Sequence, residues 1–195
     1  MLIFWKEQLA ILAVPKTGTT ALEQALTPFA DAAILNPPGL KHCTVRKFRR
    51  ELSGFFEQKG KRPLALCAVM REPISWLGSW YRYRGRPQLD GHPNSTAKVS
   101  FDEFIDAYLS AKPPEFARVG SQAQFLEGGV DYLFRYDRPE DLLGFLQDRL
   151  GRSIDLPRLN VSPVIELTLS EKMRSRLEKQ AAADFALWKT LTRQA

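Results

Sequence analysis

The sequence predicts an α/β fold with a central, mainly parallel sheet flanked by helices. Residues 9–14 and 64–70 are continuously apolar, which is typical of strands that are buried on both faces. Each run leads into residues with helical spacing, and this alternation of strand and helix continues along the chain. A length of 195 residues and a hydrophobic content of 44% are enough for a substantial core. We therefore expect one domain over residues 1–195.

The N-terminal half contains the short elements. Residues 2–5 are expected to form a short strand at an edge of the sheet, and residues 32–35 a further apolar run closed by the turn-forming residues 36–39. Thr44 is the expected N-cap of the next helix. The apolar face of that helix is predicted to consist of Val45, Phe48, Leu52 and Phe55.

The elements after residue 70 have clearer boundaries. Pro73 suits the first turn of a helix in which Leu77, Trp80 and Tyr81 share one face and Ser75 and Ser79 another. Residues 85–98 are rich in turn-forming residues and predict a surface loop or lid. Residues 100–103 form a capping box. A strand is expected at 132–136, a helix from 139 to a stop at 151, and a last helix from a capping box at 168–171 to about residue 191.

Composition limits the classes of partner. The net charge of +6 suits an anionic partner. No block of like charge is long enough for a nucleic-acid arm, and the basic residues between 41 and 50 alternate with apolar ones, which favours a solvated helix face, so no nucleic-acid partner is expected. The two cysteines, Cys43 and Cys67, fit neither a disulfide framework nor a zinc site. Without an apparent signal peptide or transmembrane run, a cytoplasmic location is expected.

Residues 14–20 predict an anion site. The sequence Val-Pro-Lys-Thr-Gly-Thr-Thr lies between an apolar strand and a helix, and the first backbone N–H groups of a helix have no partners within it. Lys16 adds a positive charge, and Thr17, Thr19 and Thr20 add hydroxyl donors. Lys16 precedes Gly18, so the loop differs from the usual nucleotide loop of ATP-binding proteins.

Two segments resemble the nucleotide-binding motifs of sulfotransferases that use 3′-phosphoadenosine 5′-phosphosulfate (PAPS). Residues Pro15, Lys16, Thr17, Gly18, Thr19 and Thr20 resemble the 5′-phosphosulfate loop of that family. Residues 70–81 look like its 3′-phosphate segment, with Arg71, Pro73, Ser79 and Tyr81 in register. Trp76 stands where many relatives carry an arginine. Both motifs are expected at the carboxyl edge of the sheet, where α/β folds bind ligands.

His42 is the candidate general base. Residues 41–44, Lys-His-Cys-Thr, resemble a stretch of carbohydrate-type and bacterial sulfotransferases in which the histidine deprotonates the acceptor. The alternative is a loop histidine that only caps or packs. His92 is expected to be an ordinary exposed residue. Weaker similarities at 100–108, 156–160 and 183–185 are explained equally well by helix caps, turns and core positions.

The resemblance implies a three-layer P-loop-like fold and transfer of a sulfuryl group from PAPS to a hydroxyl acceptor, with a carbohydrate as the favoured class and 3′-phosphoadenosine 5′-phosphate (PAP) as product. Lys16 would stabilise the leaving group, Arg71 and Ser79 would bind the 3′-phosphate, His42 would act as base, and no metal would be needed. The alternatives are a non-catalytic nucleotide-binding protein and a P-loop kinase-like phosphotransferase. The acceptor and the oligomeric state are left open.

Overall fold

The computed structural model describes residues 1–156 and 167–192, and the chain divides into two compact units. Unit 1 consists of Met1–Arg71 and Gln122–Leu159, and unit 2 of Glu72–Ser121 and Asn160–Ala195. Each unit has its own core and is considered separately. The single domain predicted for the whole chain stays a prediction.

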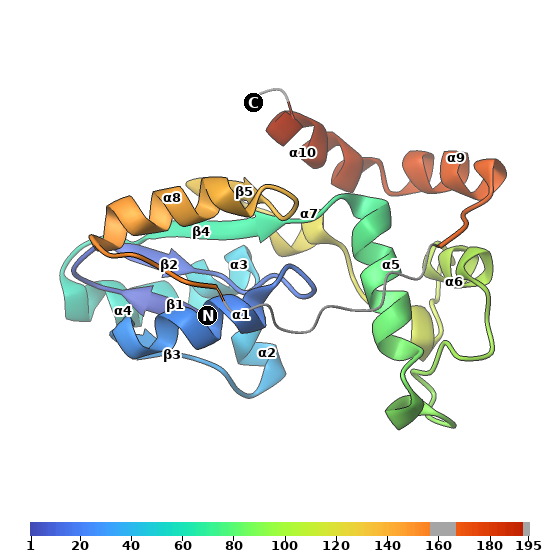
Figure 1. The fold of residues 1–195 in the computed structure, drawn as a ribbon, viewed down its shortest axis with the longest axis horizontal. Coiled ribbons are helices and arrows are strands. Elements are labelled where there is room, and N and C mark those ends of the chain that lie inside the picture. Colours follow the sequence, from blue (N-terminus) through green and yellow to red (C-terminus); the bar gives the residue numbers. More distant parts are fainter. Residues whose placement is uncertain (157–166, 193–195) are drawn as a thin grey trace. The chain divides into compact units, whose positions relative to one another are not determined.

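Unit 1 is built around one sheet, in the order β3-β1-β2-β4-β5 (Figure 1). β2 pairs in parallel with β4, and β4 in parallel with β5, whereas β1 is antiparallel to both β2 and β3. Only β1 therefore runs against the common direction within this sheet, and the predicted mainly parallel α/β architecture is confirmed. The strands are β1 (Leu2–Phe4), β2 (Leu9–Ile11), β3 (Ala32–Ala33), β4 (Ala65–Met70) and β5 (Tyr132–Arg135).

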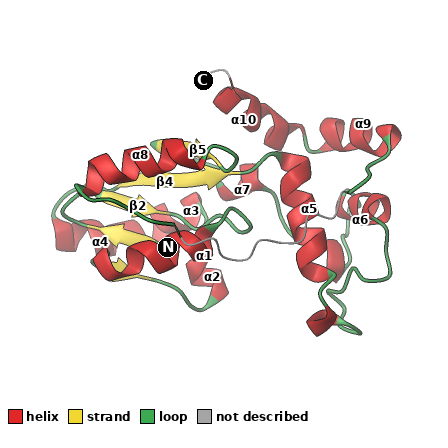
Figure 2. Ribbon diagram, viewed as in Figure 1, coloured by secondary structure: helices red, strands yellow, loops and turns green. Residues whose placement is uncertain are grey.

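Helices cover both faces of this sheet (Figures 1 and 2). Leu22 and Leu26 of α1 and Leu142 and Leu146 of α8 join one buried cluster with the strands, while α3 and α4 lie behind the sheet in Figure 1. Unit 1 contains α1 (Thr19–Leu26), η1 (Thr27–Phe29), α2 (Pro38–Lys41), α3 (Val45–Lys47), η2 (Phe48–Leu52), α4 (Ser53–Gly60), α7 (Gln122–Phe125) and α8 (Pro139–Leu150). The predicted helix stop is confirmed, since Gly151 has a φ of 63°.

The expectation that the first strand lies at an edge is wrong. β1 lies between β3 and β2, and its three residues are at most 1% exposed. Because Leu2, Ile3 and Phe4 are all apolar, the strand gains most when both its faces and both its neighbours are protein. The two-residue strand β3 takes the edge instead, and short edge strands expose few unpaired backbone groups.

The predicted apolar face of the helix after Thr44 is wrong at its end. Thr44 is the N-cap, as predicted, and its Oγ1 accepts a hydrogen bond from the backbone N–H of Lys47 at 3.2 Å. Phe55, however, is 59% exposed, whereas Phe56 is 4% exposed. The segment η2 is a π-helix, which turns less per residue than an α-helix and so delays the inward face by one position.

Unit 2 is helical in the part that the structure describes. It contains α5 (Pro73–Arg84), η3 (Pro87–Leu89), α6 (Phe101–Tyr108), η4 (Glu115–Ala117), α9 (Glu171–Gln180) and α10 (Ala182–Thr192). The predicted capping box at Ser100 and Glu103 is present at the start of α6. Residues 85–98 are largely exposed, as predicted, but Thr96 is buried and donates a hydrogen bond to the Tyr81 carbonyl at 2.7 Å.

The last predicted helix is wrong in its cap and its continuity. Ser170, rather than Thr168, caps α9 by accepting a hydrogen bond from the Met173 N–H. The helix then breaks at Ala181, which has φ −102° and ψ 29°. The break lets α9 pack against α6 while α10 packs against α5. Tertiary packing therefore overrides the high helix propensity of the alanines at this point.

Among the described residues, no helix combines the length and the apolar character that crossing a membrane would require.

Exchanging each of the adjacent phenylalanines of α4 for alanine tests the π-helix register. Phe56→Ala should lower the free energy of unfolding by about 3–5 kcal/mol because it opens a cavity in a packed core. Phe55→Ala, the matched control, should change it by less than about 1 kcal/mol because that ring is mostly exposed. Urea denaturation of both variants measures the difference, and equal losses would contradict the assigned face.

Candidate functional site

The loop between β2 and α1 has the backbone of a tight strand-to-helix turn. Lys16 has a φ of 66° and Gly18 a φ of 77°, both in the left-handed region. The Thr17 side chain is 2% exposed, and its hydroxyl donates a hydrogen bond to the Val14 carbonyl at 2.8 Å. The single hydroxyl proton of Thr17 thus holds the loop closed, and its predicted role as a phosphate donor stays a prediction.

Helix α1 begins without a capping side chain. Its N-cap is Gly18, which has no side chain to accept hydrogen bonds from the N–H groups of the first turn. These N–H groups lie at the positive end of the helix dipole. Thr19 and Thr20, the first residues of α1, carry the hydroxyls predicted to join them. The turn is therefore suited to an anionic ligand.

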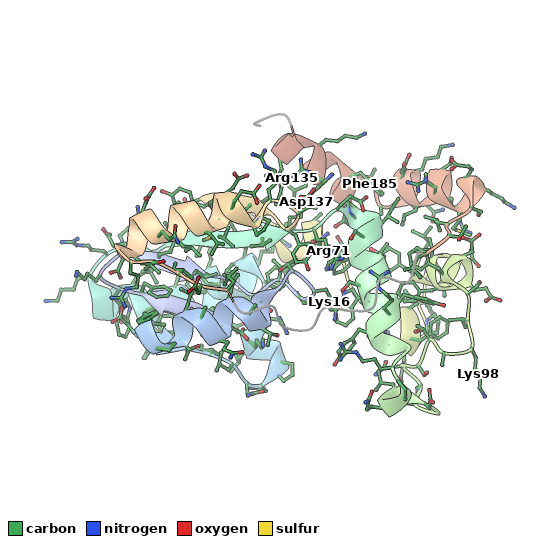
Figure 3. The ribbon with its side chains drawn as sticks, in the orientation of Figure 1. Lys16, Arg71, Lys98, Arg135, Asp137 and Phe185 are labelled. Carbon is green, nitrogen blue, oxygen red and sulfur yellow. The ribbon has the colours of Figure 1, made fainter. Side chains whose placement is uncertain are left out.

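Arg71 lies directly after β4, beside this loop (Figure 3). Its Nη1 donates a long hydrogen bond, 3.5 Å, to the carbonyl of Lys16. Its Cζ lies 4.4 Å from the centroid of the Tyr136 ring, within the range of a cation–π interaction. The predicted convergence of Lys16 and Arg71 at one edge of the sheet is thus seen within unit 1.

Tyr136 also limits what can stand at position 18. A Cβ at Gly18 would lie 3.3 Å from Cε2 of the Tyr136 ring. The Tyr136 ring therefore lies against the loop after β2 and also stacks with the guanidinium of Arg71, which follows β4. Tyr136 was predicted only as a strand residue. Nothing in the neighbouring sequence indicates that its ring contacts both Gly18 and Arg71.

The side chain of Gln122 holds the backbone of Arg71. It is 0% exposed; its Oε1 accepts from the Arg71 N–H at 2.9 Å and its Nε2 donates to the Arg71 carbonyl at 2.7 Å. Both hydrogen-bonding groups of the Arg71 backbone are thereby satisfied by one side chain. Sequence reasoning missed this residue because its partner is 51 positions away.

His42 follows α2 and contacts the end of the strand that leads into the Lys16 loop. Its Nδ1 lies 2.7 Å from the Ala13 carbonyl. A carbonyl only accepts, so Nδ1 carries the proton, and Nε2 holds the lone pair of the neutral ring. Burial lowers the pKa of His42 below 6.5, and the charge of Lys41 lowers it further, while the Ala13 bond and Glu23 oppose the shift. His42 is therefore neutral near pH 7.

An ion pair fixes the short helix that precedes His42. Lys41 Nζ lies 2.6 Å from Oε2 of Glu23, and the Glu23 side chain is 10% exposed. Glu23 belongs to α1 and Lys41 is the last residue of α2. The helix that starts at the anion-suited turn thus also anchors the segment that carries the histidine.

Neither cysteine is a reactive thiol. Burial raises the pKa of Cys43 above its ordinary value, and raises that of Cys67 to about 12. Cys67 is fully buried, which confirms the prediction of a small core residue.

Within residues 1–156 and 167–192, no three His, Cys, Asp or Glu side chains are grouped so that they could hold a metal ion.

The four motif residues of the predicted 3′-phosphate segment are divided between the units. Arg71 belongs to unit 1, and Pro73, Ser79 and Tyr81 belong to unit 2. Ser79 is 6% exposed and is therefore buried, as Trp76 and Leu77 of the same helix are. The Tyr81 hydroxyl donates to the Val99 carbonyl at 2.8 Å. Trp76 packs edge-on against Trp80 and is therefore a core residue.

The weaker sequence similarities have structural explanations. The match at 100–108 is the capped helix α6. Asp184 is 5% exposed and accepts a hydrogen bond from Ser121 at 2.8 Å. His92 is exposed, as predicted, and its Nδ1 accepts from the Asn94 N–H. In the match at 156–160, residues 157–160 lie outside the described residues.

No protein-family model matches this chain, and no curated protein matches its sequence. The sulfotransferase resemblance consequently rests on the motifs of the sequence itself.

The turn at Gly18 can be tested by a matched pair of glycine substitutions in unit 1. Gly18→Ala should cost roughly 1–2 kcal/mol of unfolding free energy, because alanine resists a positive φ and meets the Tyr136 ring. Gly144→Ala, within α8 and with nothing within 4 Å of the added Cβ, should instead stabilise by about 0.5–1 kcal/mol. Urea denaturation measures both. A Gly18→Ala variant as stable as the native chain would contradict the described turn.

Proposed function

We propose that this protein is a sulfotransferase that moves a sulfuryl group from PAPS to a hydroxyl acceptor. The observation that carries the proposal is that the side chains of Arg71 and His42 meet the loop that contains Lys16 at one edge of the unit 1 sheet. Arg71 donates to the carbonyl of Lys16, and His42 donates to that of Ala13, three residues earlier in the same strand and loop. An anion-suited turn, two cations and a neutral histidine are thereby grouped.

The residues at this edge suit a doubly phosphorylated adenosine. The first turn of α1 and Lys16 offer donors and positive charge to the 5′ side, and a three-layer P-loop-like arrangement would account for this use of the turn. Arg71, with its rigid fork of donors, suits the 3′-phosphate. Binding the remote phosphate would both select this nucleotide and orient its reactive end.

The proposed chemistry divides between a leaving side and an attacking side. The nucleotide supplies a sulfuryl group activated by its bond to the 5′-phosphate. Lys16 and the α1 N–H groups stabilise the negative charge that develops on the departing phosphate oxygen, and a single such donor is worth roughly 3–4 kcal/mol in the transition state.

On the attacking side, His42 Nε2 accepts the proton of the acceptor hydroxyl. The Nδ1–H bond to the Ala13 carbonyl fixes the ring so that the basic nitrogen is Nε2. The oxygen freed of its proton forms the new bond to sulfur as the bond from sulfur to the phosphate oxygen breaks. We propose a carbohydrate as the class of acceptor, on the resemblance of residues 41–44 to carbohydrate-type enzymes.

Replacing His42 tests the proposed base. His42→Ala should lower kcat by about 10²–10⁴-fold, the usual contribution of a placed base, and leave PAP affinity unchanged. In the native enzyme kcat/KM should fall as the pH drops, with a midpoint below 6.5, because burial lowers the pKa of His42 and only the neutral ring accepts a proton. Rates of sulfuryl transfer to mixed carbohydrate and phenol acceptors measure both effects.

The exposed His92 supplies the control for this experiment. His92→Ala should keep both the native rate and the acid limb of the pH profile. An unchanged rate in His42→Ala would remove this residue from catalysis. Native protein that binds PAP but transfers nothing to any acceptor would instead favour the non-catalytic alternative.

Ligand binding separates the proposed nucleotide site from an ATP site. PAP at 100 times its dissociation constant should stabilise the protein by about 2.7 kcal/mol, seen as a raised Tm, whereas ATP with magnesium should not. Arg71→Ala should weaken PAP binding by roughly 1.5–3 kcal/mol through the lost charged contact. Arg149→Ala, an equal change of charge at a residue that donates to the Glu7 carbonyl, should leave it unchanged. Stabilisation by ATP with magnesium alone would point to a kinase-like phosphotransferase.

A further inference from the structure

Gln122 makes two buried side-chain hydrogen bonds at this edge of the sheet, and the proposed reaction does not use this residue. Its amide makes two hydrogen bonds of normal length, 2.9 and 2.7 Å, to the N–H and the carbonyl of Arg71. The side chain is 0% exposed, so water does not compete for these bonds. A fully buried amide that satisfies a single residue's backbone fixes that residue in place.

The residue that is held in this way begins the segment after β4. Arg71 no longer belongs to the strand, which ends at Met70. Backbone pairing with the neighbouring strand β5 also reaches this point, since the Tyr136 N–H donates to the Met70 carbonyl at 2.8 Å. The amide of Gln122 thus continues the backbone pairing one residue beyond the sheet. It replaces a strand partner for Arg71, whose side chain lies beside the Lys16 loop.

The position of the Arg71 backbone determines where its guanidinium lies. The guanidinium stacks on the Tyr136 ring with 4.4 Å from Cζ to the centroid, and Nη1 reaches the Lys16 carbonyl. The 3.5 Å bond to Lys16 is long and weak compared with the two bonds from Gln122. The two bonds from Gln122 therefore restrain the arginine more strongly than the bond to the Lys16 carbonyl does.

We infer that Gln122 is a positioning residue, which holds Arg71 where it distinguishes a nucleotide with a 3′-phosphate from one without it. The inference rests on the proposed function, because it takes Arg71 as the 3′-phosphate ligand. Gln122 touches neither nucleotide nor acceptor in this scheme and acts only through the Arg71 backbone.

The experiment compares affinities for PAP and for adenosine 5′-monophosphate (AMP), which lacks the 3′-phosphate, by calorimetry on the full-length chain. Gln122→Met keeps the length of the side chain and removes both hydrogen bonds. It should reduce the preference for PAP over AMP by about tenfold or more, the value of a contact to a charged group, while AMP affinity stays near native. In an Arg71→Ala background, Gln122→Met should cause no further loss of preference.

Two further variants separate positioning from stability. Leu146 lies in the hydrophobic core of unit 1 and, like Gln122, is 0% exposed. The Leu146→Ala variant should be less stable than the native protein yet keep the native preference for PAP. Gln122→Glu retains the acceptor for the Arg71 N–H, and its protonated form also donates to the Arg71 carbonyl. Its preference for PAP, relative to native protein at the same pH, should recover as the pH falls, whereas that of Gln122→Met should not.

The outcomes distinguish this inference from the proposed function. Native protein that binds PAP no better than AMP would overturn the role of Arg71 and, with it, the inference. Native preference with an unchanged preference in folded Gln122→Met would overturn the inference alone. A loss of preference that persists equally in the Arg71→Ala background would also overturn it, because Gln122 would then act without Arg71.

Discussion

Parallel pairing between β2 and β4 is the constraint on which the candidate site depends. Ile11 stands opposite Cys67, and the Leu12 N–H donates to the Cys67 carbonyl at 2.8 Å. Counting equally along both strands from that pair leads to Val14 and Met70, the last residues before the Lys16 loop and Arg71. The register of the two strands therefore brings the Lys16 loop and Arg71 to the same edge of the sheet, and a shift of register would separate them.

The electrostatics of this edge follow from what is buried beside it. Lys16 and Arg71 are both positive, and Arg71 is accommodated by the face of the Tyr136 ring and by the Lys16 carbonyl. His42 avoids adding a third charge, because burial and the neighbouring Lys41 both lower its pKa. Glu23 in turn compensates Lys41 at 2.6 Å. An edge with two cations and a neutral imidazole suits an anionic ligand.

The parts of the fold that could be predicted from the sequence have local signals. The apolar runs gave β2 and β4, Pro73 gave the start of α5, and the Ser100 capping box gave α6. The errors arose where packing decides. Phe56 replaces Phe55 on the inward face because of a π-helix, which no residue pattern announces. The end of α9 at Ala181 is likewise set by the different helices that α9 and α10 contact.

The candidate site shows the same division. Lys16, Gly18, His42 and Arg71 were predictable because each belongs to a short motif next to a recognisable element. Gln122 and Tyr136 were not, because they act on residues more than fifty positions away, and a glutamine or tyrosine is common in many other roles. Ser79 was expected on a different face of its helix from Leu77, Trp80 and Tyr81, and helical spacing alone did not indicate that it is buried.

Most of the side-chain bonds at this edge end on backbone groups, and this gives the site its stability against changes in sequence. Thr17 donates to Val14, His42 to Ala13 and Arg71 to Lys16, in each case to a carbonyl. Carbonyls are present whatever residue supplies them, so the neighbouring side chains are free to vary while the geometry persists. The local geometry then depends on the residues whose own side chains make these bonds and on the glycine that leaves space for the ring of Tyr136. Residues around the motifs therefore carry little information about the site, and its recognition depends on a few positions spread along the chain.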